Sequence, residues 1–261
     1  MKENHVSESR PEVMNKIGIV LLMLSGLVPL RSFFSSPPDL MLLVYTLFVV
    51  LVLFRRRIRR AMERIPLPPS LQFIIFSVVS GWIAEVCAWS DAYVMRSEHP
   101  VLLHPQLIPD LTLAIGFYAG WALGWLVIFL FCRVSVAGVF ITTGIYGVFF
   151  EQDGAVGKMV WNQFSAHPLL AVWLALYVFA VYGAILGNGY LPLRDLLHRQ
   201  HPRFAWLKKP GVELACRYLK YPVAVALMWL GIALAFLAVS WLATRVGLVP
   251  QPKPIYEHPF F

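Results

Sequence analysis

The sequence predicts an all-α polytopic membrane protein, a transmembrane helical bundle of about seven spans. Of its 261 residues, 59% are hydrophobic and only 14% are charged. Soluble domains carry about a quarter charged residues and lack the apolar stretches of roughly 20 residues that cross a bilayer. Such stretches recur along this chain, so we expect one integral membrane domain over residues 1–261.

Seven apolar segments are candidates for spanning helices. The first is similar to the hydrophobic region of a signal peptide, but no cleavage site of the A-x-A kind follows it, so we expect it to be retained. The second contains no glycine and is typical of a helix that faces lipid. The seven segments cover residues 16–34, 38–55, 69–94, 109–132, 134–156, 167–190 and 220–246.

Basic residues gather in the links 55–64 and 191–220, whereas the links on the other side carry only Arg96 and Lys158. The positive-inside rule makes the basic side cytoplasmic, which puts the N-terminus inside and the C-terminus outside. We therefore expect a multi-pass protein of the bacterial inner (plasma) membrane. The same clustering assigns the net charge of +8 to contact with membrane lipid and not to nucleic acid.

Two segments outside the spans have distinct compositions. The link 191–219 is expected to be an interfacial cytoplasmic loop, with short amphipathic helices at 193–199 and 212–219. The tail 249–261 contains four prolines and is expected to be extended or mobile.

The spans between residues 69 and 190 are the expected functional core, because small residues recur there at four-residue spacing. Gly81 and Gly147 each precede a glutamate, Glu85 and Glu151, by four residues. Residues four apart share a helix face, and small residues let membrane helices pack closely. Both glutamates are therefore expected to face the bundle at similar depth near the outer surface. The segments 69–132 and 134–190 are either a degenerate parallel repeat or chance similarity of glycine-rich helices.

An ionisable side chain inside a membrane is a functional-site hypothesis, and three interpretations of Glu85 and Glu151 stay open. They can form a catalytic carboxylate pair with split proton affinities, acting as acid and base on a lipid or isoprenoid-like substrate. They can bind a proton or cation in a transporter. They can also be neutral packing groups in a non-catalytic subunit of a membrane complex.

Further polar and aromatic residues are candidates for substrate binding near the same membrane face. Each also has a structural interpretation: interfacial packing for the tryptophans, helix capping for Asp110, and a turn for Asp153. The candidates are Trp82, Trp89, Asp110, Tyr146, Asp153 and His167.

The sequence predicts neither a cofactor nor a metal. It contains no P-loop, GxSxG or HExxH motif, and His99 and His104 lie in a proline-containing loop without a recognised ligand spacing. Cys87, Cys132 and Cys216 form no CxxC pattern and are expected to be three unpaired thiols. Nothing in the sequence specifies an oligomeric state.

Overall fold

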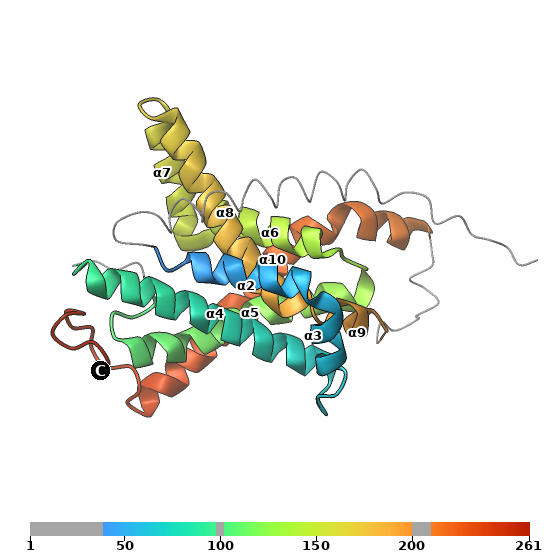
Figure 1. Cartoon of the computed structure of the whole chain (residues 1–261), viewed down its shortest axis with the longest axis horizontal. Helices are drawn as coiled ribbons and strands as arrows, with labels where there is room; N and C mark the ends of the chain where they lie inside the picture. The colour runs from blue at the N-terminus through green and yellow to red at the C-terminus, as the bar shows by residue number, and fades with distance from the viewer. Residues whose placement is uncertain (1–38, 98–101, 200–209) are drawn as a thin grey trace, which may run out of the picture.

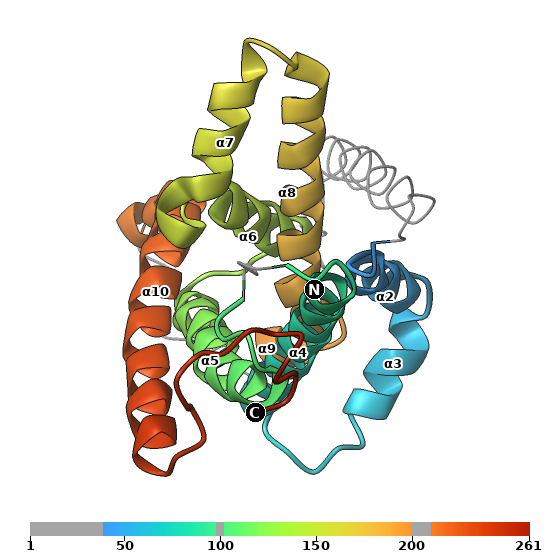
Figure 2. The same ribbon diagram turned by 90° about the vertical axis from the view of Figure 1, so that its left-hand side faces the viewer.

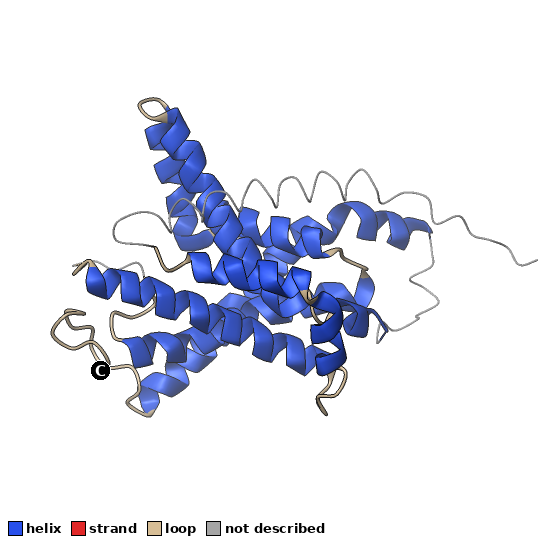
Figure 3. Cartoon of the chain, in the orientation of Figure 1, coloured by secondary structure: helices blue, strands red, loops and turns tan. Residues whose placement is uncertain are grey.

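The computed structural model describes residues 39–97, 102–199 and 210–261, and in these residues every regular element is a helix (Figure 3). The all-helical prediction is therefore confirmed for this part of the chain. The helices are α2 (Leu42–Leu53), α3 (Arg55–Met62), α4 (Pro69–Val94), α5 (Leu107–Phe131), α6 (Val136–Phe149), the 3-10 turn η1 (Glu151–Gly154), α7 (Ala155–Phe164), α8 (Pro168–Tyr190), α9 (Arg194–Arg199) and α10 (Pro210–Arg245).

Four helices are long and apolar enough to cross a membrane: α4, α5, α8 and the part of α10 from Tyr218 to Arg245. Two other predicted spans, α2 and α6, have only 12 and 14 helical residues. At about 1.5 Å per residue they fall short of a hydrocarbon core of about 30 Å. The predicted span 16–34 lies outside the described residues. The described residues thus support a membrane bundle with four span-length helices, and they do not support a count of seven.

The closest helix packing joins α5 to α10, which lie side by side (Figure 1). The small residues predicted at four-residue spacing include Gly116, Gly120 and Gly124 of α5, which we call the glycine ridge, and they make this contact. A Cβ atom on Gly120 would lie 2.4 Å from the carbonyl oxygen of Gly231 on α10, and one on Gly124 would lie 2.6 Å from the backbone nitrogen of Met228. Backbones can approach this closely only where side chains are absent.

The predicted helix 134–156 is wrong as a single element. Helix α6 ends at Phe149, the turn η1 follows, and α7 begins at Ala155. Gly154 ends the turn in the left-handed region with φ 71°, which glycine adopts without steric cost. The helix α7 and the first half of α8 then project from the bundle as an arm (Figures 1 and 2).

Within the basic link 191–219, the structure describes residues 191–199 and 210–219. The short helix α9 forms where one was expected, but the second, at 212–219, is the beginning of α10, which continues through Pro222. At the same end of the bundle α3 carries the arginines of the other basic link (Figure 1). An ion pair of 3.0 Å between Arg59 and Asp195 joins α3 to α9.

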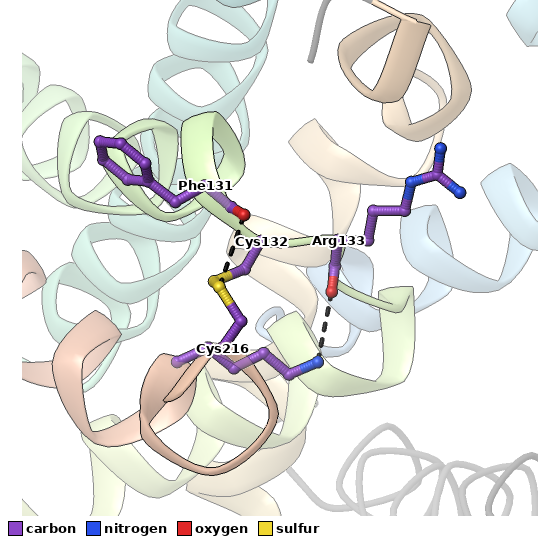
Figure 4. Close-up of a disulfide and its surroundings, with 5 residues drawn as sticks. Phe131, Cys132, Arg133 and Cys216 are labelled. Carbon is purple, nitrogen blue, oxygen red and sulfur yellow. Dashed lines mark hydrogen bonds between the residues drawn. A yellow bond between two sulfur atoms is a disulfide. The ribbon is translucent and has the colours of Figure 1, made fainter. Parts of the chain in front are cut away.

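The expectation of three unpaired thiols is wrong for Cys132 and Cys216, which form a disulfide (Figure 4). The cysteines are 84 residues apart, but the packing of α10 on α5 brings their Cα atoms to 5.6 Å. Close by, the amine of Lys220 donates a hydrogen bond to the carbonyl oxygen of Arg133 at 3.2 Å. Cys87 is a free, buried cysteine.

Residues 249–261, which we call the C-terminal strap, cross the ends of α4 and α5 (Figure 2). The amide of Gln106 donates to the carbonyl of Lys253 at 2.8 Å and accepts from its N–H at 3.3 Å. The ring of Phe260 stacks on Trp89 at 5.9 Å. The strap has no helix or strand over 250–254, as its prolines predict, but its own hydrogen bonds fasten it to the bundle.

Candidate functional site

Glu85 and Glu151 line one cavity of about 240 Å³. Three tyrosines share the lining, Tyr118, Tyr177 and Tyr182, and neither lysine nor arginine is among the described residues around it. The remaining wall is apolar and includes Met41, Ala84, Leu102, Leu103, Val178 and Ile185. The cavity therefore combines two carboxyl groups and three phenols with an otherwise apolar surface.

The first glutamate is held by α4 and α5. The Tyr118 hydroxyl on α5 donates a hydrogen bond of 2.7 Å to Oε1 of Glu85 on α4. One helical turn before Glu85, Gly81 leaves room for the tyrosine ring, because a Cβ atom there would lie 2.1 Å from the ring. The small residue that sequence analysis assigned to helix packing therefore sets the position of the glutamate's partner.

The second glutamate has the same surroundings, supplied by α6 and α8. A Cβ atom on Gly147 would lie 2.3 Å from the ring of Tyr182. Tyr182 lies within hydrogen-bonding reach of Glu151, which follows α6 in η1. The other carboxylate oxygen of Glu151, Oε2, is buried without a protein partner. Burial raises the pKa of Glu151 to about 8, and the nearby charge of Glu85 also raises it, against the opposing effect of Tyr182.

The side chains around Glu85 and those around Glu151 have the same arrangement. In each, a glycine precedes a glutamate by four residues, and a tyrosine from the next span-length helix packs on the glycine and reaches the glutamate. This correspondence involves side-chain positions as well as glycine content. It favours the parallel-repeat interpretation over chance similarity of glycine-rich helices.

Asp110 belongs to the same cluster through Glu85. It is fully buried in the first turn of α5, on the helix face that also carries Tyr118. Its Oδ1 accepts a hydrogen bond of 2.9 Å from the backbone N–H of His104, so it fastens the loop that precedes the helix. Its Oδ2 is buried without a standard hydrogen-bond partner, and the neighbouring carboxyl group is that of Glu85.

Four other candidates lie away from the cavity lining. The indole N–H of Trp82 donates to the carbonyl of Leu111 at 2.8 Å, and that of Trp89 donates to Pro105 at 3.1 Å. Both tryptophans therefore tie α4 to the chain at the start of α5. Tyr146 is buried edge-on against Trp121, and His167 is exposed at the tip of the arm. The side chain of Asp153 lies outside the described part of the structure.

Sequence analysis did not identify the three tyrosines. A signal exists for Tyr118 and Tyr182, because each is followed by a pair of small residues, Ala119-Gly120 and Gly183-Ala184. Tyr177 donates a hydrogen bond of 2.5 Å to Asp39, which is 138 residues away in the sequence. No local pattern predicts that contact.

Within the ranges that the structure describes, no three histidine, cysteine or acidic residues are grouped as a metal site requires. His104 binds the strap through its Nε2 atom, 3.1 Å from the carbonyl oxygen of Pro250. His99, the other histidine of this loop, lies outside the described residues.

No protein-family model matches the chain, and no solved structure matches it.

Proposed function

We propose that the protein is a membrane-embedded enzyme that performs acid–base chemistry on a lipid or isoprenoid-like substrate. The observation that carries the proposal is the convergence of Glu85 and Glu151, each beside a tyrosine, on one cavity with otherwise apolar walls. Carboxyl groups in such surroundings serve as general acids and bases when their proton affinities differ.

The reaction class that fits is a proton transfer with no net change in the substrate's protons. Glu85 gives a proton to an alkene carbon, and Glu151, in its ionised form, removes one from another carbon, so that a double bond moves or a ring closes. The proton then returns from Glu151 to Glu85 and restores both groups. The cationic intermediate would be stabilised by carboxylate charge and by the tyrosine rings. A cavity of about 240 Å³ is smaller than common ligand pockets of about 300–1,000 Å³, so only the reacting part of a long lipid enters it.

We place the protein in the bacterial inner membrane, with the end that carries α3 and α9 in the cytoplasm. Support comes from four helices of span length and from the arginines concentrated at that end. The cavity then lies toward the outer face, within reach of lipids in the bilayer.

A second candidate function is proton- or cation-coupled transport. It is favoured by buried polar groups on the basic side of the cavity: Asn188 donates a hydrogen bond of 3.0 Å to Ser80, and the hydroxyl of Ser77 is buried without a partner. Such groups can extend a polar path. Beyond them an aromatic layer of Phe73, Phe129 and Tyr190, with ring centroids 4.5–5.4 Å apart in successive contacts, closes the bundle. This closure favours the enzyme.

The two functions are tested with Glu85→Gln and Glu151→Gln, which keep the size of each side chain and remove its acidity. The matched control is Glu63→Gln, at the basic end, where Glu63 pairs with Arg199 at 3.4 Å. For an enzyme, mass spectrometry of lipid extracts should show that cells with either site variant accumulate a precursor and lose a product.

Unchanged lipids with intact expression and folding would contradict the enzyme. Loss of proton-driven uptake in liposomes by the same variants would establish transport instead. If neither assay responds, the glutamates serve packing or assembly in a membrane complex.

A further inference from the structure

Glu85 has a carboxyl neighbour of its own, separate from Glu151. Asp110 and Tyr118 lie eight residues apart on one face of α5, and Tyr118 contacts Glu85 directly. The indole of Trp82 on α4 bonds to Leu111, which fixes α4 against this part of α5. Asp110 consequently faces the same stretch of α4 as Tyr118 does.

The hydrogen bonds around Asp110 leave one oxygen unsatisfied. Its Oδ1 accepts from the N–H of His104, whereas Oδ2 is buried without such a donor, and the carboxyl group of Glu85 lies within hydrogen-bonding reach of Asp110. An unsatisfied carboxylate oxygen in an apolar environment is costly, and two adjacent ionised carboxylates repel each other. A single proton between the two groups removes both costs, because one carboxyl then donates to the other.

Among the residues that the structure describes around the cavity, no lysine or arginine offers another solution. The titratable groups around Glu85 come from each element packed against it, and apart from the imidazole of His104 each is acidic. They are Asp110 and Tyr118 of α5, Glu151 of η1, Tyr182 of α8, His104 of the preceding loop, and, farther out, Asp39, Cys87, Asp91 and Tyr177.

We propose that Glu85 and Asp110 hold one proton between them, and that Asp110 is a positioning residue that keeps this proton available on Glu85. Among the described side chains, Glu151 has no carboxyl group hydrogen-bonded to it in this way. Only the chemical roles, Glu85 as the acid and Glu151 as the base, rest on the proposed function. The sharing of the proton stands on the geometry of α4 and α5.

Infrared spectroscopy tests the sharing without knowledge of the substrate. The protein carries Glu151→Gln throughout, so that the second glutamate contributes nothing to the carboxylic-acid C=O absorption. Near neutral pH the pair should give such an absorption, which moves in deuterated buffer. Adding either Glu85→Gln or Asp110→Asn should abolish the same band, because the remaining partner then ionises against a permanent amide donor.

The matched control is Asp91→Asn. Asp91 is also on α4, and its carboxyl group accepts a hydrogen bond from the backbone N–H of Leu40. This substitution should leave the band intact. If only one of Glu85→Gln and Asp110→Asn removes the band, the proton belongs to a single residue. If the band persists in both variants, it arises elsewhere in the protein. Either outcome overturns the proposal. Thermal unfolding of each variant confirms that the folded protein is measured. Unchanged lipid extracts in the earlier experiment would remove the catalytic role and leave the shared proton in place.

Discussion

At Gly81 and Gly147 the absence of a methyl group lets a tyrosine ring reach the helix backbone beside a glutamate. Ring atoms occupy the positions where Cβ atoms would be, at 2.1 Å for Gly81 and 2.3 Å for Gly147. The Gly-x-x-x-Glu spacing predicts that glycine and glutamate share a face. It does not predict which side chain fills the space, because Tyr118 and Tyr182 come from other helices.

Gly81→Ala and Gly147→Ala should each displace the tyrosine from its glutamate. Overpacking of this kind costs about 1–3 kcal/mol, so we expect a lower thermal unfolding temperature in detergent and reduced function. The control Val79→Ile adds a methyl group on the exposed face of α4, where Val79 is 41% accessible. If the alanine variants unfold at the same temperature as the control, the packing account of these glycines is wrong.

Glu151 should make stability depend on pH. Its pKa is about 8 in the folded protein, chiefly through burial, against an ordinary value of 4.5, so the folded state binds an extra proton between these values. The contribution of this proton to the free energy of unfolding is then fully present below about pH 4.5 and is lost as the pH rises through about 8. Glu151→Gln has no such proton to lose. We expect the variant's advantage in unfolding temperature to grow from pH 5 to pH 9, whereas parallel curves would contradict the assignment.

At the scale of elements, sequence predicts the glycine ridge of α5 but not its partner. The ridge packs on α10, which begins 79 residues after α5 ends and meets it at Gly231. Periodicity describes one helix face and carries no information about the helix that covers it. The disulfide was missed for the same reason, because it depends on this pairing.

Gly120→Leu should push α10 away from α5 and prevent the Cys132–Cys216 bond. The added side chain would meet the backbone of α10, which cannot move aside as a flexible side chain can. Non-reducing electrophoresis of purified protein, oxidised in air and then alkylated, should show the bond in the parent and its loss in the variant. Leu123→Ala on the same helix, at a position 45% exposed, should retain it. Retention in Gly120→Leu would show that the helices tolerate separation.

Hydropathy also fails to predict where α6 ends. A hydropathy window extends the apolar run of 134–156 through Glu151, whereas the turn signal Gln152-Asp153-Gly154 ends it. The turn prevails because Gly154 adopts a conformation that a continuous helix excludes. The arm that follows exposes Trp161 and Leu169 at 81% and 87%.

For the whole molecule, composition and hydropathy suffice to predict an all-helical membrane protein. They do not give the number of spans, because α2 and α6 are apolar but short. The charge pattern predicts the orientation, which is a separate property from the fold. The predicted orientation puts Cys132 and Cys216 at the cytoplasmic end. The cytoplasm is reducing, so these cysteines would be reduced in growing cells and would form their disulfide after isolation.

Orientation can be measured with single cysteines in a background where all three natural ones are serine. Arg56→Cys lies on exposed α3 at the basic end, and Lys253→Cys lies on the exposed strap at the other. On intact spheroplasts a membrane-impermeant maleimide should label position 253 and spare position 56 until the cells are lysed. The reverse pattern would invert the proposed topology, and labelling of both would contradict it.

The C-terminal strap has a consequence for biosynthesis. The strap is translated after α4, α5 and α10, yet it covers the loop whose His104 is hydrogen-bonded to Asp110. Membrane insertion of α4, α5 and α10 therefore precedes completion of the end of the bundle that holds the carboxyl groups. That end of the bundle is covered only after the strap has been synthesised, so early folding of the site proceeds without it.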